Sequence, residues 1–289
     1  MLFSVIIPCK NEGKNIKMTI DSILTNSCKV SKEIIVVDDA SNDNCCHFLK
    51  NKEYRQISFY TTSGLGAAQA RNYGAGLAKG EILVFCDAHI KVEAFWLQKL
   101  AEDIIKGDVK AVSPAIAVLE RVDQIGFGQT WDSELKIKWL INKPSSTTQV
   151  PLLPGGCMAI AQSAFEEVGG FDKGFKVWGH EDEEISLKLW LFNHPCAVNP
   201  AVTVEHLFRP KHPYRVLMYH VHYNLLRMAY SHFKMERVEK VKEKIKGIAY
   251  YEKLLKELLE SDVMKQRKIY FSSRTHDDDW FMCKFGINF

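Results

Sequence analysis

Short apolar runs alternate with stretches of helical spacing along the first third of the chain, and this alternation limits the fold more than any other feature. The apolar runs at residues 3–7, 33–37, 57–61 and 82–86 are mostly continuous, as is typical of strands buried on both faces of a parallel sheet. Strand–helix repetition of this kind implies right-handed crossovers, so we expect an α/β fold with a mostly parallel sheet flanked by helices. The helices are expected at residues 12–25, 43–50, 65–79 and 95–106.

The regular repeat ends near Gly126, where a stretch rich in glycine and tryptophan begins. A further strand is expected at residues 157–160, with helices at 163–168 and 181–192. Beyond residue 212 the chain has helical spacing to about residue 259, and its apolar side chains fall near a heptad repeat. We expect this extension to pack one apolar stripe on the preceding domain, while the heptad spacing leaves a homodimer contact open. The stripe consists of Val238, Val241, Ile245, Ile248, Leu255 and Leu259.

Bulk composition excludes several classes of protein. The formal net charge of +3 lacks the strong basic bias of a general nucleic-acid binder, so no nucleic-acid partner is expected. Apolar stretches are too short for a transmembrane segment, and the run at residues 2–8 is too short for a signal sequence. Eight scattered cysteines, of which only Cys45 and Cys46 are adjacent, lack zinc-type spacing and predict free thiols in a cytoplasmic protein. The lysine-rich residues 234–246 leave a peripheral membrane contact open, although alternating glutamates would keep it weak.

Polar residues follow several of the predicted strands, at the sheet edge where α/β folds bind ligands. Asp87 and His89 come directly after the fourth strand and, being two residues apart, lie on the same side of the chain. A carboxylate and an imidazole there suit a divalent ion such as Mn²⁺, which would neutralise a diphosphate leaving group. The alternative is an aspartate that caps the next loop beside an incidental histidine, because Asp-x-His alone is a weak motif.

Three further segments offer candidate residues. Glu181 and Asp182 open a predicted helix, where acids are favoured by the helix dipole alone, or where one of them could act as a general base. Trp178 would then shape the acceptor wall. His206 ends a strand-like segment, and a lone histidine there is more often structural than a metal ligand. The glycine pair that ends at Gly66 fails the dinucleotide fingerprint and instead allows a tight turn before a helix.

Taken in order, these segments resemble glycosyltransferase family 2 and its GT-A fold, which has a Rossmann-like sheet. The likeness rests on residues 5–12 (VIIPCKNE), 34–41 (IIVVDDAS), 64–72 (GLGAAQARN) and 80–87 (GEILVFCD). Within that superfamily the motifs are most similar to polypeptide N-acetylgalactosaminyltransferases, which have an Asp-x-His motif, a Gly-Gly turn, a Trp-Gly-x-Glu segment and a His-x-Phe-Arg element. The resemblance implies a GT-A domain at 1–212, with a nucleotide-sugar-binding half at 1–112 and an acceptor half at 113–212, before a helical extension at 213–289.

The resemblance also implies individual roles. Asp87, His89 and His206 would be the protein ligands of Mn²⁺ (or Mg²⁺), and Asp39 would contact the uracil base. Gly155, Gly156 and Trp178 would form the sugar and acceptor pocket. The segment at 274–280 is a candidate lid or an ordinary disordered or packed C-terminus. The nucleotide-sugar would contact Pro8, Lys10, Glu12, Asp39, Gly66, Arg71, Asp87 and Ala88.

One departure from this resemblance bears on stereochemistry. The retaining enzymes have Glu-Asn where this chain has Glu181 and Asp182, and Glu-Asp is instead similar to inverting enzymes such as β-galactosyltransferases. Inversion needs a base on the acceptor side, opposite the leaving diphosphate, and Asp182 could supply it. We therefore expect inverting, metal-dependent transfer from a UDP-sugar to a hydroxyl or thiol of a glycan, lipid-linked or peptide acceptor. A retaining transferase and a non-catalytic nucleotide-sugar-binding module are the alternatives.

Overall fold

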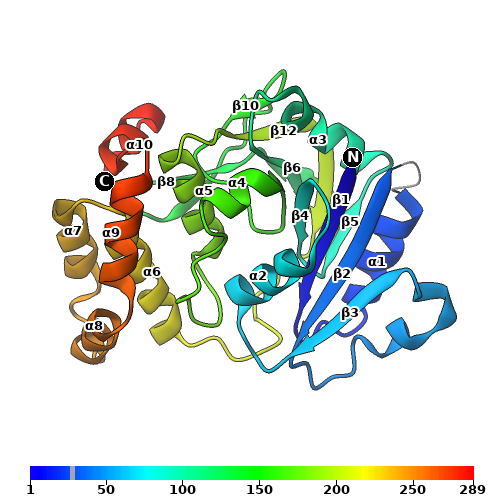
Figure 1. Ribbon diagram of the computed structural model, residues 1–289, viewed down its shortest axis with the longest axis horizontal. Coiled ribbons are helices and arrows are strands. Elements are labelled where there is room, and N and C mark those ends of the chain that lie inside the picture. Colours follow the sequence, from blue (N-terminus) through cyan, green and yellow to red (C-terminus); the bar gives the residue numbers. More distant parts are fainter. Residues whose placement is uncertain (27–29) are drawn as a thin grey trace.

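The computed structural model describes residues 1–26 and 30–289 and has the α/β architecture that the strand–helix alternation predicts (Figure 1). Strands β3 (Ile57–Thr62), β2 (Ser31–Asp39), β1 (Leu2–Cys9) and β4 (Ile82–Cys86) lie side by side in that order. All three of their pairings are parallel. Each of the four predicted apolar runs lies within one of these strands, which confirms the predicted fold class.

The other half of the sheet mixes strand directions. Strand β11 (Cys157–Ala161) runs antiparallel to β4 and to β6 (Ala111–Val118), and β12 (Cys196–His206) runs parallel to β6. Because β11 is antiparallel to β4, its first residue lies beside the last residue of β4, which brings the Gly-Gly turn to Asp87. Shorter strands complete the structure: β5 (Ile90–Val92) and β10 (Thr148–Gln149) on β12, β7 (Arg121–Gly126) on β6, and the separate pair β8 (Gln129–Trp131) and β9 (Ile137–Trp139).

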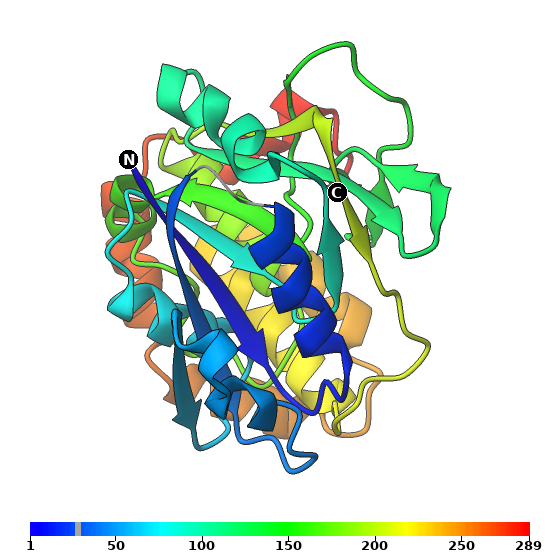
Figure 2. The ribbon, with the colours of Figure 1, turned by 90° about the vertical axis from the view of Figure 1, so that its right-hand side faces the viewer.

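Helices cover both faces of the sheet because side chains alternate along each strand. Val5 and Ile7 of β1 belong to the apolar cluster that includes side chains of α1 (Asn15–Asn26) and α3 (Trp96–Lys106). The ribbons of these two helices can be followed in Figure 2. Ile6 between Val5 and Ile7 faces the opposite cluster, which includes α2 (Ala67–Leu77), α4 (Gln162–Glu167) and α5 (Glu181–Leu191). The segment predicted as a short helix at 43–50 is only partly helical and forms two 3₁₀ turns, η1 (His47–Lys50) and η2 (Lys52–Tyr54).

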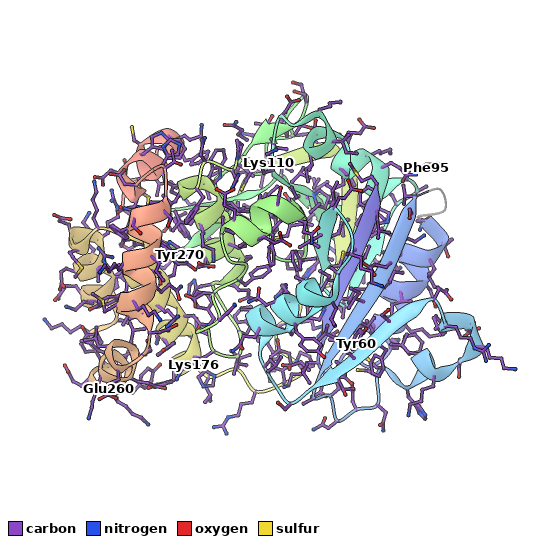
Figure 3. All side chains as sticks on the ribbon, in the orientation of Figure 1. Tyr60, Phe95, Lys110, Lys176, Glu260 and Tyr270 are labelled. Atoms are coloured by element: carbon purple, nitrogen blue, oxygen red, sulfur yellow. The ribbon has the colours of Figure 1, made fainter. Side chains whose placement is uncertain are left out.

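Five helices follow the sheet and lie together on the left in Figure 1: α6 (Met218–His232), α7 (Met235–Ile245), α8 (Tyr251–Glu260), α9 (Val263–Ser273) and α10 (Asp278–Phe285). Where α9 meets the rest of the chain, the ring of Tyr270 stacks on His232 of α6, with centroids 4.9 Å apart (Figure 3). Val238, Val241 and Ile245 of the heptad stripe are buried within the chain itself. Leu259 of the stripe is instead 46% exposed, and Leu254 and Leu258 are the buried leucines of α8, because α7 and α8 are separate helices and the heptad spacing does not continue between them. The stripe therefore packs on the chain as expected at its start but not at Leu259, and a homodimer contact stays a prediction.

The acidic and aromatic segment near the C-terminus is packed rather than poised over the sheet edge. Asp278 and Asp279 pair with Arg237 of α7 at 2.5 and 2.6 Å, and Trp280 packs against Trp190 of α5. The lid hypothesis for residues 274–280 is therefore not supported, and the alternative of a packed C-terminus fits the structure.

Two findings bear on the predicted absence of a membrane span and on the predicted free thiols. None of the helices in the described part of the chain is long and apolar enough to cross a membrane. The seven cysteines that the structure describes are free thiols, as expected, and Cys28 lies outside the described residues. The cytoplasmic location stays a prediction.

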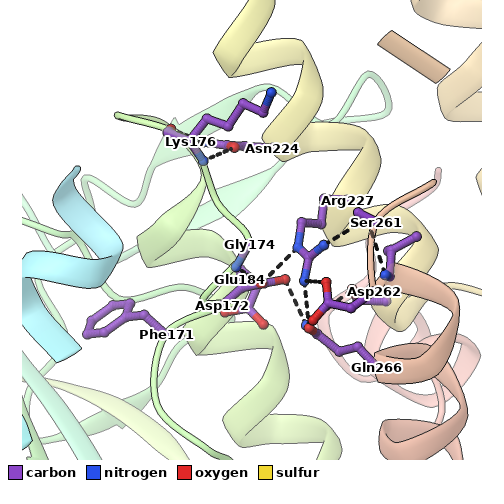
Figure 4. A network of polar contacts seen from close by, with 12 residues as sticks. Phe171, Asp172, Gly174, Lys176, Glu184, Asn224, Arg227, Ser261, Asp262 and Gln266 are labelled. Carbon is purple, nitrogen blue, oxygen red and sulfur yellow. Dashed lines mark hydrogen bonds and ion pairs between the residues drawn. The ribbon is translucent and has the colours of Figure 1, made fainter. Parts of the chain in front are cut away.

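A buried polar network fastens the C-terminal helices to the loop before α5 (Figure 4). The fully buried Arg227 of α6 donates through Nε to Asp172 Oδ1 at 2.8 Å. Its NH2 group donates to Gln266 Oε1 of α9 at 2.7 Å, and Gln266 Nε2 donates to Asp172 Oδ2 at 2.8 Å. Because Arg227 and Asp172 are buried and Gln266 bonds to both, the network fixes α6 and α9 against the domain that contains the sheet.

Replacement of Arg227 by leucine would leave the Asp172 carboxylate buried without its counter-charge. Breaking a buried ion pair in this way costs about 3–5 kcal/mol, so we expect Arg227→Leu to lower the free energy of unfolding in urea by that amount. Lys256→Ala is the control: it removes an exposed pair with Glu260 at 3.8 Å and should change stability by less than about 0.5 kcal/mol. An Arg227→Leu protein as stable as the parent would contradict this account.

Candidate active site

A cavity of about 590 Å³ opens at the carboxyl ends of β1, β2 and β4, the edge at which α/β sheets bind ligands. Every residue that the sequence proposed for donor, acceptor or metal binding or for catalysis lines it, so the structure brings together residues from seven separate segments of the chain. These residues are Pro8, Lys10, Glu12, Asp39, Gly66, Arg71, Asp87, Ala88, His89, Gly155, Gly156, Trp178, Glu181, Asp182 and His206.

Asp87, His89 and His206 form a cluster whose ligand atoms all lie within 4.8 Å of one another. His206 Nε2 is 3.1 Å and His89 Nε2 is 3.8 Å from the same oxygen, Asp87 Oδ2. Strand pairing explains the convergence, because β5 directly follows the Asp87 turn and places Ile90 opposite His206 on β12. Two imidazole nitrogens and one carboxylate oxygen match the donor set that Mn²⁺ accepts, so these residues could hold the ion.

Neighbouring charges keep the Asp87 carboxyl ionised. Burial alone would raise its pKa, but the hydrogen bond with His206 and the charge of Arg71 hold the pKa below its usual value. Arg71 NH2 donates to Asp87 Oδ1 at 2.9 Å, and NH1 donates to Glu181 Oε1 at 3.2 Å. The buried Arg71 thus connects the metal cluster at the end of β4 with the first residue of α5.

Little space surrounds the side chains of Asp87, His89 and His206. Gly156 lies so close to His206 that an added Cβ would be 2.8 Å from Cδ2 and 3.3 Å from Nε2. Its carbonyl also accepts a hydrogen bond from the Asp87 backbone N–H at 2.9 Å. On the other side, His89 Nδ1 lies 3.3 Å from Glu12 Oε1, and Arg209 pairs with the same carboxylate. Glu12 therefore places a carboxylate beside the second ring nitrogen of His89.

Four consecutive acids open α5, and their partners differ. Glu181 is held by Arg71 and by the backbone N–H of Gly179, 2.8 Å from Oε2. Glu183 is held by His180 and Trp131, while Glu184 is held by Lys188 and His232 deeper in the core. The described contacts of the Asp182 carboxylate are backbone N–H groups, those of Gly155 and Glu183, both at 3.0 Å.

The pKa of Asp182 is raised to about 7. Burial is the largest cause, the charges of Glu181 and Glu183 add to it, and the charge of Arg71 opposes it. A carboxyl group with a pKa near neutral can accept a proton and release it again, as a general base must. Asp182 is therefore the acid at the start of α5 that is suited to proton transfer.

The loop that leads into α5 is strained. Val177 has φ 35° and His180 has φ 65°, conformations that are unusual for residues with a Cβ. The Val177 carbonyl accepts from the Ala67 backbone N–H at 2.7 Å, at the start of α2. Gly66 permits this approach, because a Cβ there would lie 2.8 Å from Val177 Cα. Asn224 of α6 holds the loop from the other side by accepting from the Lys176 backbone N–H and donating to the carbonyls of Lys176, Trp178 and Gly179.

At the predicted nucleotide end of the cavity, the Asp39 carboxylate already accepts hydrogen bonds from other residues of the chain. It accepts from Thr62 Oγ1 at 2.6 Å and from the backbone N–H groups of Leu65 and Gly66 at 2.5 and 2.9 Å. Lys10 Nζ donates to the Asp39 carbonyl at 2.9 Å. Asp39 therefore fixes the glycine loop above the cavity, and a contact with the base would compete with these bonds.

Several lining residues were not predicted from the sequence. Trp178 packs on His212 with ring centroids 4.4 Å apart, and Trp139 packs on Phe208 at 6.0 Å. The aromatic residues in the segment after Arg209 could have suggested a wall of the cavity. Their contact with Trp178 could not be predicted, because the two segments are far apart in the sequence. The unpredicted lining residues include Gln129, Trp139, His180, Phe208, His212 and Tyr214.

Two family models match the chain. The model described as glycosyl transferase family 2 matches residues 4–169, and that described as the N-terminal domain of galactosyltransferase matches residues 138–220. The first model covers more than half of the chain and confirms the family resemblance. The second spans the segments that contain Trp178, Asp182 and His206.

The chain is also similar to curated transferases. It is 29% identical to polypeptide N-acetylgalactosaminyltransferase 14 of Homo sapiens over 230 residues, 73% of this chain and 41% of that protein. It is 32% identical to polypeptide N-acetylgalactosaminyltransferase 8 of Drosophila melanogaster over 228 residues, 71% of this chain and 38% of that protein. The chain thus spans about two fifths of the length of these relatives.

Solved structures share the fold. GalNAc-T7, solved with UDP, GalNAc and Mn²⁺, matches with a TM-score of 0.76 at 24% identity, over 99% of this chain and 56% of that one. TarS 1–349 of S. aureus, solved with UDP-GlcNAc, matches with a TM-score of 0.59 at 17% identity, over 97% of this chain and 78% of that one. These matches confirm the GT-A fold.

Gly156→Ala tests the geometry of the metal cluster without removing a ligand. The added Cβ would displace His206, so we expect Mn²⁺ affinity to fall about 10–100-fold, the usual effect of disturbing a residue that orients a ligand. Gly76→Ala is the control, because a Cβ there meets nothing within 4 Å. Binding would be measured by electron paramagnetic resonance of free Mn²⁺. Equal affinities of the two variants would argue against His206 as a ligand.

Proposed function

The chain belongs to glycosyl transferase family 2, and from this membership we propose that it moves a sugar from a UDP-sugar donor to an acceptor hydroxyl or thiol. The observation that carries the proposal is one cavity that contains both the Asp87–His89–His206 cluster and Asp182. The cluster suits a metal-bound diphosphate, and Asp182 suits removal of a proton from the acceptor. Transfer requires both functions within reach of one anomeric carbon.

We assign the donor to the end of the cavity beside β1, β2 and β4. Pro8 and Lys10 would line the nucleotide, Asp39 would shape the loop around it, and Arg71 would support its diphosphate end through Asp87. Mn²⁺ held by Asp87, His89 and His206 would neutralise the charge of the leaving diphosphate. The donor set of the cluster supports this assignment, as does the shared fold with GalNAc-T7, which was solved with UDP, GalNAc and Mn²⁺.

We assign Asp182 as the general base of an inverting transfer. Its carboxylate would take the proton of the acceptor group as the acceptor oxygen or sulfur forms a bond to the anomeric carbon and the bond to UDP breaks. Glu181 would keep Arg71 in place instead of reacting, because its two oxygens are already paired. The raised pKa of Asp182 and the match of residues 138–220 to a galactosyltransferase domain support this division of roles.

A retaining transfer is the second candidate, favoured by the similarity to polypeptide N-acetylgalactosaminyltransferases. Those names also favour a peptide acceptor over a glycan or a lipid-linked sugar. The acceptor would lie along Trp178, His212 and Tyr214, whose aromatic rings suit either a sugar face or a peptide side chain. A domain that binds a nucleotide-sugar without transferring it would need no base, so this third function would leave Asp182 without a role.

The decisive experiment is release of UDP from a panel of UDP-sugars in the presence of Mn²⁺. We expect turnover with at least one donor, and its loss when the metal is chelated or when Asp87 is replaced by alanine. Circular dichroism of Asp87→Ala would verify that the fold is intact. Full activity of Asp87→Ala with the metal chelated would refute the metal assignment, and donor binding without turnover would identify a binding module.

Asp182→Asn should retain donor binding but lose about 10²–10⁴-fold in the transfer rate, the usual contribution of a general base. In the parent protein the rate should increase as the pH rises through about 7, because only the ionised carboxylate can accept the proton. The anomeric configuration of the product, determined by NMR, should be opposite to that of the donor. Unchanged transfer by Asp182→Asn, or retained configuration, would remove Asp182 as the base of an inverting reaction.

A further inference from the structure

Three cysteine side chains converge beneath the nucleotide end of the cavity. Cys9 is the last residue of β1, and Cys45 and Cys46 lie in the loop after β2. Cys9 Sγ is 3.5 Å from Cys45 Sγ and 3.6 Å from Cys46 Sγ, and the sulfurs of Cys45 and Cys46 are 3.8 Å apart. All three side chains are buried. Each sulfur therefore contacts both of the others.

The backbone places these sulfurs together independently of any sulfur contact. Parallel pairing of β1 with β2 makes the two strands end side by side, so the loops that follow them are neighbours. Hydrogen bonds of 2.8 Å join the loops, from Gly13 N to Asp43 Oδ2 and from Asn42 N to Asn11 Oδ1. Asp43 Oδ1 also accepts from Cys45 N at 3.0 Å. Hydrogen bonds of the two loops thus fix the positions of the three sulfurs.

The sulfur separations match those around a tetrahedral metal ion. With Zn–S bonds of about 2.3 Å, two thiolates of one zinc ion lie about 3.8 Å apart. The fourth position has an oxygen at hand, because Ser41 Oγ lies 3.5 Å from Cys45 Sγ. Buried cysteines can also act as small apolar side chains, as the pair Cys86 and Cys157 does at 3.9 Å. A closed triangle of three sulfurs is a more specific arrangement than such a pair.

We propose that Cys9, Cys45 and Cys46 form a three-thiolate site for a thiophilic divalent ion such as Zn²⁺. This site is separate from the Asp87–His89–His206 cluster and has a different ligand preference, since thiolates select zinc whereas nitrogen and oxygen ligands suit Mn²⁺. Binding would release the thiol protons to solvent. The ion would link the loops after β1 and β2, and so fix Pro8 and Lys10 at the nucleotide end of the cavity.

Co²⁺ is the probe that separates the two metal sites, because a thiolate ligand gives it a near-ultraviolet charge-transfer band and imidazole or carboxylate does not. The full-length protein, reduced and free of metal, should develop this band with one equivalent of Co²⁺, and Zn²⁺ should abolish it. His206→Ala should keep the band, and so should Cys283→Ser, which changes an exposed thiol outside the cluster. Cys45→Ser and Cys46→Ser should each lose it.

A second measurement on the unaltered protein guards against misfolding of the cysteine variants. Alkylation followed by peptide mass spectrometry should show that Zn²⁺ slows modification of Cys9, Cys45 and Cys46 while Cys283 reacts at the same rate. Absence of the charge-transfer band in the parent protein, its persistence in both Cys45→Ser and Cys46→Ser, or equal alkylation with and without Zn²⁺ would each overturn the proposal. None of these readouts depends on sugar transfer, so they stand apart from the proposed function.

Discussion

The buried ion pairs of Arg71 are the interaction on which the arrangement of the cavity depends. Asp87 at the end of β4 and Glu181 at the start of α5 are 94 residues apart in sequence, and both are acids in a largely desolvated place. One guanidinium bonded to both removes their repulsion and fixes their separation. A single cation therefore links the Asp87–His89–His206 cluster to the first residue of α5, which directly precedes Asp182.

The helical extension contributes to the same arrangement from the opposite side. The loop that leads into α5 contains positive φ angles at Val177 and His180, and strain of this kind persists only where surrounding structure holds it. Gly66 at the start of α2 and Asn224 on α6 supply that support, and Arg227 ties α6 to the same loop through Asp172. The C-terminal helices are thus part of the scaffold of the cavity, although they contribute few of its lining residues.

How much the sequence could predict follows from the geometry of parallel strands. Asp39 and Asp87 could be placed at one edge because the carboxyl ends of β2 and β4 must meet there, and no long-range contact had to be known. The sulfur triangle could not be predicted, since Cys9 and Cys45 are 36 residues apart and their meeting depends on how two loops pack. The hydrogen bonds of Asn224 to the loop before α5 could not be predicted for the same reason. Family resemblance alone pointed to His206 as a candidate ligand, and the structure places it beside Asp87 and His89.

The four acids at the start of α5 show where sequence reasoning ends. Glu181, Asp182, Glu183 and Glu184 are equivalent as helix-opening acids, and the helix dipole favours all of them. The fold makes them different through their partners. Glu181 pairs with Arg71, and Glu183 bonds with His180 and Trp131. Glu184 pairs with Lys188 and His232. Among the four, only the Asp182 carboxylate has backbone donors alone in its described hydrogen bonds. Its pKa is raised to about 7 by burial and by the charges of Glu181 and Glu183, which the charge of Arg71 offsets only in part. The proposal of Asp182 as the base therefore rests on the burial and the partners of each acid, and those properties exist only in the folded chain.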